Sequence, residues 1–74
     1  MTPTEIARSL TEAQKEALLA ARWIHPGGQE PMCLAPFTDV WPAGVATFFS
    51  LHTDRLTPLG LKVRAALERM NDEQ

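Results

Sequence analysis

The feature that most limits the fold of this chain is a run of prolines and glycines through its centre. Proline fixes φ and has no backbone N–H, so it ends helices and is excluded from the interior of a sheet. Any helix or strand in this stretch must therefore be short, and longer elements are confined to the two flanks. The stretch extends over residues 26–44 and contains Pro26, Gly27, Gly28, Pro31, Pro36, Pro42 and Gly44.

Two helix starts follow one another in the N-terminal flank. Residues 2–5 combine a threonine N-cap, a proline at the first helical position and a glutamate, and residues 11–14 form a second capping box. Apolar residues continue with helical spacing to Ile24. The pattern fits either one long helix or a short helical lead-in over residues 1–10 followed by a helix over residues 11–24. The Pro-Gly-Gly sequence at 26–28 predicts that this helix ends near His25.

The central part of the chain offers two strand candidates. One is residues 32–35. The other is residues 45–51, which are rich in β-branched and aromatic side chains and would place Val45, Thr47, Phe49 and Leu51 on one face; a helix is the competing interpretation. Residues 52–54 carry short polar side chains that can hydrogen-bond their own backbone, which predicts a turn.

The last helix is the best defined by the sequence. Thr57 is a good N-cap, Pro58 suits the first helical position, and apolar residues recur with helical spacing as far as Met70. We predict a helix over residues 58–70 and a frayed tail over residues 71–74, because two acidic residues there oppose the helix dipole.

The length of 74 residues predicts one small domain over residues 1–74. We expect an α+β fold in which two main helices enclose a small β-hairpin. Chains this short rarely gain enough stability from their core alone, so a homodimer or another protein partner is expected. The single cysteine, the absence of a signal peptide and the absence of a long apolar run predict a cytoplasmic protein without a membrane segment.

Charge is distributed unevenly along the chain. Seven Lys and Arg stand against nine Asp and Glu, for a formal net charge of -2, and residues 23–54 contain no Lys or Arg. Affinity for nucleic acid rests largely on basic side chains that neutralise phosphates. The composition therefore disfavours nucleic acid as the partner of the central segment.

Two short segments resemble parts of MarR-like winged-helix domains. Residues 10–18, Leu-Thr-Glu-Ala-Gln-Lys-Glu-Ala-Leu, are similar to the opening helix of that family, and residues 56–60, Leu-Thr-Pro-Leu-Gly, are similar to the segment where the wing returns into the last helix. The resemblance implies a reduced winged-helix architecture and, as the alternative function, a DNA-binding transcriptional regulator. Its candidate nucleic-acid contacts are Arg55, Lys62, Arg64 and Arg69.

All five aromatic residues of the chain lie between residues 23 and 49. Most are expected in the core, but those beside prolines in a segment free of basic charge are candidates for a protein interface. The favoured hypothesis is a small non-catalytic binding or regulatory protein that acts through protein contacts. Its candidate partner-binding residues are Phe37, Trp41, Phe48 and Trp23.

Catalysis and metal binding are disfavoured. His25, Cys33 and His52, with Asp39 or Asp54, match no zinc-ligand spacing, and no orienting group accompanies a cysteine–histidine nucleophile pair. No nucleophile elbow or glycine-rich phosphate loop is present in the sequence. We therefore expect no enzyme activity, no catalytic residue, no metal and no cofactor.

Overall fold

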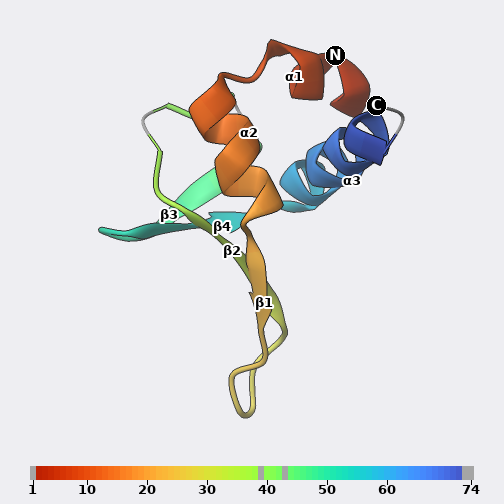
Figure 1. The fold of residues 1–74 in the computed structure, drawn as a ribbon. Coiled ribbons are helices and arrows are strands. Elements are labelled where there is room, and N and C mark those ends of the chain that lie inside the picture. Colours follow the sequence, from red (N-terminus) through yellow and green to blue (C-terminus); the bar gives the residue numbers. More distant parts are fainter. Residues whose placement is uncertain (1, 39, 43, 73–74) are drawn as a thin grey trace.

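The computed structural model describes residues 2–38, 40–42 and 44–72, and it confirms the α+β class (Figure 1). Two helices precede a four-stranded antiparallel sheet of order β1-β2-β4-β3, and a third helix follows it. The sheet between the helices consists of two hairpins, so it is larger than the single hairpin that we expected. The elements are α1 (Pro3–Ser9), α2 (Glu12–Leu19), β1 (Arg22–Ile24), β2 (Met32–Pro36), β3 (Ala46–Ser50), β4 (Thr53–Leu56) and α3 (Pro58–Asp72).

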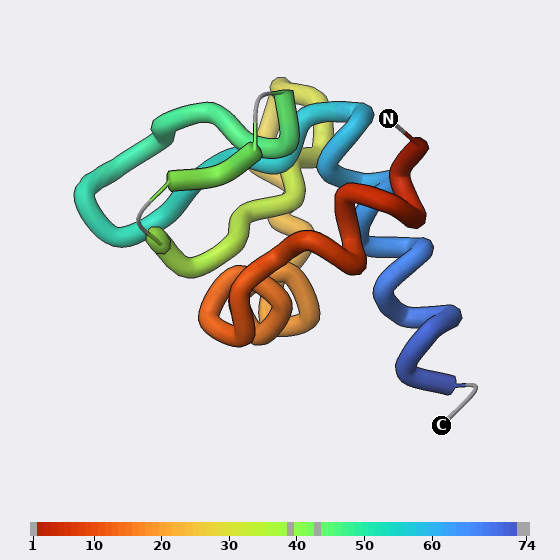
Figure 2. The backbone as a smooth tube through the Cα atoms, turned by 90° about the horizontal axis from the view of Figure 1, so that it is seen from above, coloured from red at the N-terminus to blue at the C-terminus, as the bar shows by residue number. Residues whose placement is uncertain are grey.

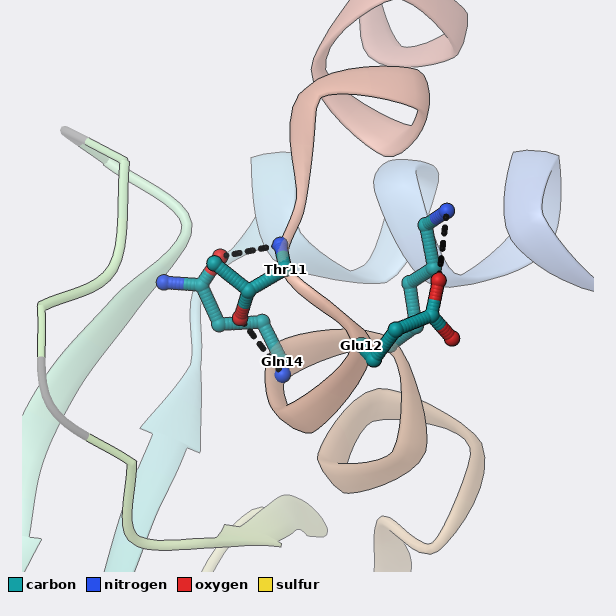
Figure 3. A network of polar contacts seen from close by, with 4 residues as sticks. Thr11, Glu12 and Gln14 are labelled. Atoms are coloured by element: carbon teal, nitrogen blue, oxygen red, sulfur yellow. Dashed lines mark hydrogen bonds and ion pairs between the residues drawn. The ribbon is translucent and has the colours of Figure 1, made fainter.

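Both predicted N-terminal helix starts are confirmed, and they belong to separate helices. Thr2 caps α1 by accepting a hydrogen bond from the backbone N–H of Glu5. Thr11 and Gln14 form a reciprocal capping box at the start of α2: the Gln14 N–H donates to Thr11 Oγ1 at 3.2 Å, and the Thr11 N–H donates to Gln14 Oε1 at 3.0 Å (Figure 3). A capping box satisfies two backbone donors that the helix itself leaves unpaired. These contacts fix where the chain turns between α1 and α2.

The predicted helix over residues 11–24 is too long, because α2 ends at Leu19. Arg22–Ile24 instead forms strand β1, which pairs with β2 so that Trp23 lies opposite Cys33. The Pro-Gly-Gly sequence belongs to the connection between these strands, where Gly28 has a φ of 76° that suits glycine. This hairpin projects from the body of the molecule (Figure 1). Cross-strand pairing therefore overrides the helical spacing of the last apolar residues.

The second strand of that hairpin and the strand after Gly44 are both confirmed, as β2 and β3. The helix alternative for the latter segment is wrong. The prediction that Val45, Thr47, Phe49 and Leu51 share one face fails toward the end of β3. There, a register irregularity between Phe48 and Ser50 interrupts the pairing with β4. The predicted turn at residues 52–54 is confirmed only at His52, because the turn consists of Leu51 and His52 and Thr53 already begins β4.

Helix α3 begins where the sequence predicts and continues to Asp72, two residues beyond the predicted end at residue 70. Thr57 accepts a hydrogen bond from the Gly60 N–H at 3.1 Å and donates toward the carbonyls of Gly44 and Val45. A Cβ at Gly60 would lie 2.0 Å from the carbonyl oxygen of Val45. The Thr-Pro-Leu-Gly segment therefore joins the start of α3 to the start of β3 at close range.

The core lies between the helices and one face of the sheet. Leu18, Val45 and Val63 are its largest fully buried side chains, and α1 packs against α3 (Figure 2). Arg64 of α3 ties two helices together, because its Nε donates to the Leu18 carbonyl at 3.2 Å. Its guanidinium also lies 3.4 Å from Glu68.

Candidate protein-contact surface

The candidate site is organised around Asp54, in the middle of β4. This residue lies opposite Ala35 of β2 on one side and opposite Phe48 of β3 on the other. Residues directly opposite each other in a sheet point to the same face. Because Ala35 and Asp54 are buried, this is the face that the helices cover.

Trp41 reaches across this face from the loop before β3. Its indole Nε1 donates to Oδ2 of Asp54 at 2.8 Å, and its ring is partly buried against the core. The same loop is attached to α2, where the buried side chain of Gln14 donates to the carbonyl of Val40. The two hydrogen bonds hold Trp41 in a defined position between α2 and β4.

Phe48 lies on β3 and Phe37 directly follows β2, the two strands that flank β4. The Phe37 N–H donates to the His52 carbonyl at 2.9 Å, which continues the β2–β4 ladder by one residue and puts Phe37 on the same face as Ala35. Phe37 is 49% exposed and Phe48 is 69% exposed. Both therefore present aromatic rings to solvent on the helix-facing side of the sheet. We call Phe37, Trp41 and Phe48 the aromatic surface.

A shallow, mainly apolar groove adjoins this surface. It has a volume of about 350 Å³ and lies between α2 and the end of β2. Ala13, Ala17 and the acidic Glu16 of α2 belong to one wall, and Phe37 belongs to the other. The groove gives a partner side chain a place beside the exposed ring of Phe37.

Trp23, the fourth predicted contact residue, lies apart from the aromatic surface. It is on β1, at the edge of the sheet opposite to β3, and is 47% exposed. Neighbouring strands are about 4.8 Å apart, so two intervening strands separate Trp23 from Phe48 by roughly 14 Å. The fold thus brings together three of the four predicted residues.

Three further exposed apolar residues were not predicted as contact residues from the sequence. Val40 is 80% exposed, Leu51 is 79% exposed at the β3–β4 turn, and Phe49 is 46% exposed at the register irregularity. Asp54, the acceptor for Trp41, was expected in a turn. Periodicity gave no signal for Phe49, Leu51 and Asp54, because their environment depends on where β3 ends and β4 begins. Val40 lies in the loop before β3, where no periodicity applies.

The four basic residues of the alternative hypothesis have different environments. Lys62 and Arg69 are exposed on α3, and Arg55 is exposed on β4. Arg64 is partly buried by its contacts with Leu18 and Glu68. In the described residues from 20 to 57, where a helix-turn-helix would carry its recognition helix, the chain forms strands and loops without a helix.

Cys33 is buried in β2, and burial raises the pKa of its thiol, with Arg64 lowering that pKa and Glu68 raising it as lesser effects. A raised pKa disfavours the thiolate that nucleophilic or metal chemistry needs. Within the part of the chain that the structure describes, no three His, Cys, Asp or Glu side chains gather as metal ligands. Asp39, one of the residues weighed from the sequence, lies outside the described residues.

Comparisons with protein-family models, with curated proteins and with solved structures give no match to this chain. Among the described residues, no helix has the length and apolar character needed to cross a bilayer.

Proposed function

We propose that this chain is a small, non-catalytic binding protein that regulates or joins a protein partner through its aromatic surface. The observation that carries the proposal is the position of Phe37 and Phe48. They are exposed on one side of the sheet, on either side of β4, and Trp41 is anchored to β4 by Asp54.

The energetics of protein interfaces favour this use of the surface. Aromatic rings supply large contact areas with few rotatable bonds, and tryptophan and tyrosine are enriched among residues that dominate binding energy. Trp41 and the neighbouring loop are already ordered by hydrogen bonds to Asp54 and Gln14. A partner would therefore meet a surface whose central ring loses little freedom on binding.

Charge supports a protein partner over nucleic acid. Residues 23–54 carry no Lys or Arg, and this range includes the whole aromatic surface. Aromatic rings that stack on nucleic-acid bases are normally accompanied by a basic groove along the phosphates. A mainly apolar protein surface is the better complement.

The test is affinity capture from a host lysate with the tagged chain, with and without nuclease. The comparison variant carries Phe37→Ser and Phe48→Ser, which remove exposed rings and leave the core intact. The control is Leu19→Ser, because Leu19 is a 40% exposed apolar residue on α2 outside the aromatic surface.

We expect a protein that is retained after nuclease by the wild type and by the Leu19 variant, and lost from the double variant. Trp23→Ser tests whether the opposite edge of the sheet contributes. Equal retention by all four chains, or loss of the protein on nuclease treatment, would contradict the proposal.

A further inference from the structure

The hydrogen-bond pattern of the sheet shows which backbone groups of β3 are available for another strand. The Thr57 N–H donates to the Val45 carbonyl at 3.1 Å, so Val45 and Thr57 occupy a hydrogen-bonded position of the ladder, although the Val45 N–H itself donates to the Pro42 carbonyl. In an antiparallel ladder such pairs alternate with pairs whose N–H and C=O groups point outward. Ala46 and Phe48 therefore direct their backbone groups away from β4, and Thr47 directs its own toward Arg55.

The other side of β4 gives the same result independently. The Phe37 N–H donates to the His52 carbonyl, which makes Ala35 and Asp54 a hydrogen-bonded pair two residues further along. Asp54 then directs its backbone N–H and C=O toward β2. The backbone N–H and C=O of Phe48, which lies opposite Asp54, therefore have no hydrogen-bond partner on β4. Within the described residues, β3 has a neighbouring strand on one side only.

The edge formed by β3 lacks most of the features that protect sheet edges. Natural edges are commonly blunted by charged side chains, by proline, by β-bulges or by very short strands. Residues 46–50 are Ala-Thr-Phe-Phe-Ser, without charge or proline. The other edge strand, β1, has three residues and includes Arg22. β3 carries one protecting feature, the register irregularity between Phe48 and Ser50. Within the described residues, the regular and uncharged part of this edge is therefore residues 46–48.

We propose that β3 pairs with β3 of a second copy of this chain, antiparallel and centred on Thr47. This register places Ala46 of each chain in a hydrogen-bonded pair with Phe48 of its partner, so that all outward groups of these two residues are used. It also sets the large Phe48 ring opposite the small Ala46 side chain, twice by symmetry. The register irregularity after Phe48 lies outside the paired residues.

The choice of a second copy as the occupant follows from self-complementarity, and the available area limits the strength of the dimer. A two-fold axis needs a surface that matches itself, and an uncharged strand brings no like charges together. Phe48 and Phe49 are 69% and 46% exposed, which corresponds to about 200 Å² of accessible ring surface per chain. A standard interface buries roughly 800 Å² per partner. We therefore expect a weak dimer that dissociates on dilution.

The inference rests on the proposed function, because Phe48 belongs both to the aromatic surface and to the new strand pair. The test introduces charges of opposite sign at Thr47, the residue on the two-fold axis, in two separate variants. Sedimentation equilibrium from about 10 µM to about 1 mM protein measures the dimer dissociation constant of each. Thr47→Glu places two carboxylates opposite each other in the dimer, while in the single chain the new side chain lies opposite Arg55. Circular dichroism establishes that the variants are folded.

We expect the wild type to dimerise within this range, and Thr47→Glu and Thr47→Lys each to raise the dissociation constant about fivefold or more. An equimolar mixture of the two variants should recover the association as a heterodimer. A monomeric wild type at the highest concentration, or a mixture that associates no better than either variant alone, would overturn the proposal.

A second pair of variants tests the backbone itself. Phe48→Pro removes the outward N–H without removing a bond to β4, because proline is tolerated on edge strands whose N–H faces solvent. Phe48→Thr is the matched control, since it also lacks the ring but keeps the N–H. We expect weaker dimerisation for the threonine variant and none for the proline variant. Equal association of the two would exclude pairing through these backbone groups.

The two proposals fail in different ways. A monomeric wild type whose captured protein depends on Phe37 and Phe48 would leave the proposed function intact and overturn the dimer. A dimer that the Thr47 variants weaken singly and restore when mixed, with no other protein captured, would support the dimer and overturn the proposed function.

Discussion

Trp41 donates its indole hydrogen to Asp54 at 2.8 Å, and this bond connects the loop before β3 to β4, an inner strand of the sheet. Asp54 is 4% exposed, so its carboxylate has lost most of its water. A buried carboxylate is costly unless donors replace that water. The bond therefore stabilises the loop and shapes the aromatic surface at the same time.

Replacing Trp41 by Phe should lower the free energy of unfolding by about 1–3 kcal/mol, because the ring stays apolar while the buried carboxylate loses a donor. Urea denaturation measures the change. Asp54→Asn is the control, since its amide oxygen still accepts, and it should cost less than the Trp41 change. A loss near zero for Trp41→Phe would show that the bond does not stabilise the loop.

Gly60→Ala should be strongly destabilising, by about 2–3 kcal/mol or more, because the new Cβ would overlap the Val45 carbonyl unless α3 moved away from β3. Thermal unfolding monitored by circular dichroism measures it. The matched control is Gly27→Ala, where a Cβ would have no atom within 4 Å. Equal melting temperatures for the two variants would contradict the close approach.

Thr57→Ala should lower the free energy of unfolding by about 1 kcal/mol. The Gly60 N–H loses its side-chain acceptor, and the Gly44 carbonyl loses the hydroxyl that donates to it. Thr57→Ser keeps the hydroxyl and should retain most of the stability. Chemical denaturation of the two variants side by side makes the comparison. A serine variant as unstable as the alanine variant would assign the loss to the methyl group.

The Cys33 thiol should react slowly with a thiol reagent in the folded chain and rapidly in urea, because burial raises the pKa of this thiol and restricts access to it.

The raised pKa of Cys33 also determines how the free energy of unfolding depends on pH. Folding favours the neutral thiol, so its contribution to stability is complete below the unfolded pKa of about 8.5 and is lost as pH rises through the folded value.

The matched variant for this pH effect is Cys33→Ala. The difference in free energy of unfolding between the wild type and this variant should be constant near neutrality and should decrease in alkaline solution. A difference that increases with pH would contradict the direction of the pKa change.

Local signals predicted the helix starts well. Thr2, Thr11 and Thr57 each cap a helix as expected, because an N-cap depends on residues within one turn of it. The end of α2 was predicted poorly. Helical spacing through Ile24 competed with strand pairing between Trp23 and Cys33, and the pairing partner lies ten residues further along the chain.

For the aromatic surface too, the residues were predicted but their arrangement was not. Phe37, Trp41 and Phe48 were predicted as contact residues from their position in a proline-rich segment that is free of basic charge. The sequence did not show that they would lie around Asp54, because that arrangement depends on the register of β2, β4 and β3. It also grouped Trp23 with them, although the strand order places Trp23 at the opposite edge.

By itself, the sequence determined that long elements are confined to the flanks, where each helix begins, and that the centre of the chain is free of basic charge. Only the tertiary structure decided that the centre forms two hairpins, that Asp54 is buried beneath Trp41, and that β3 ends the sheet with outward-facing backbone groups. The physical reason is range: caps and proline effects act within a few residues, whereas strand order, register and burial depend on contacts between distant segments.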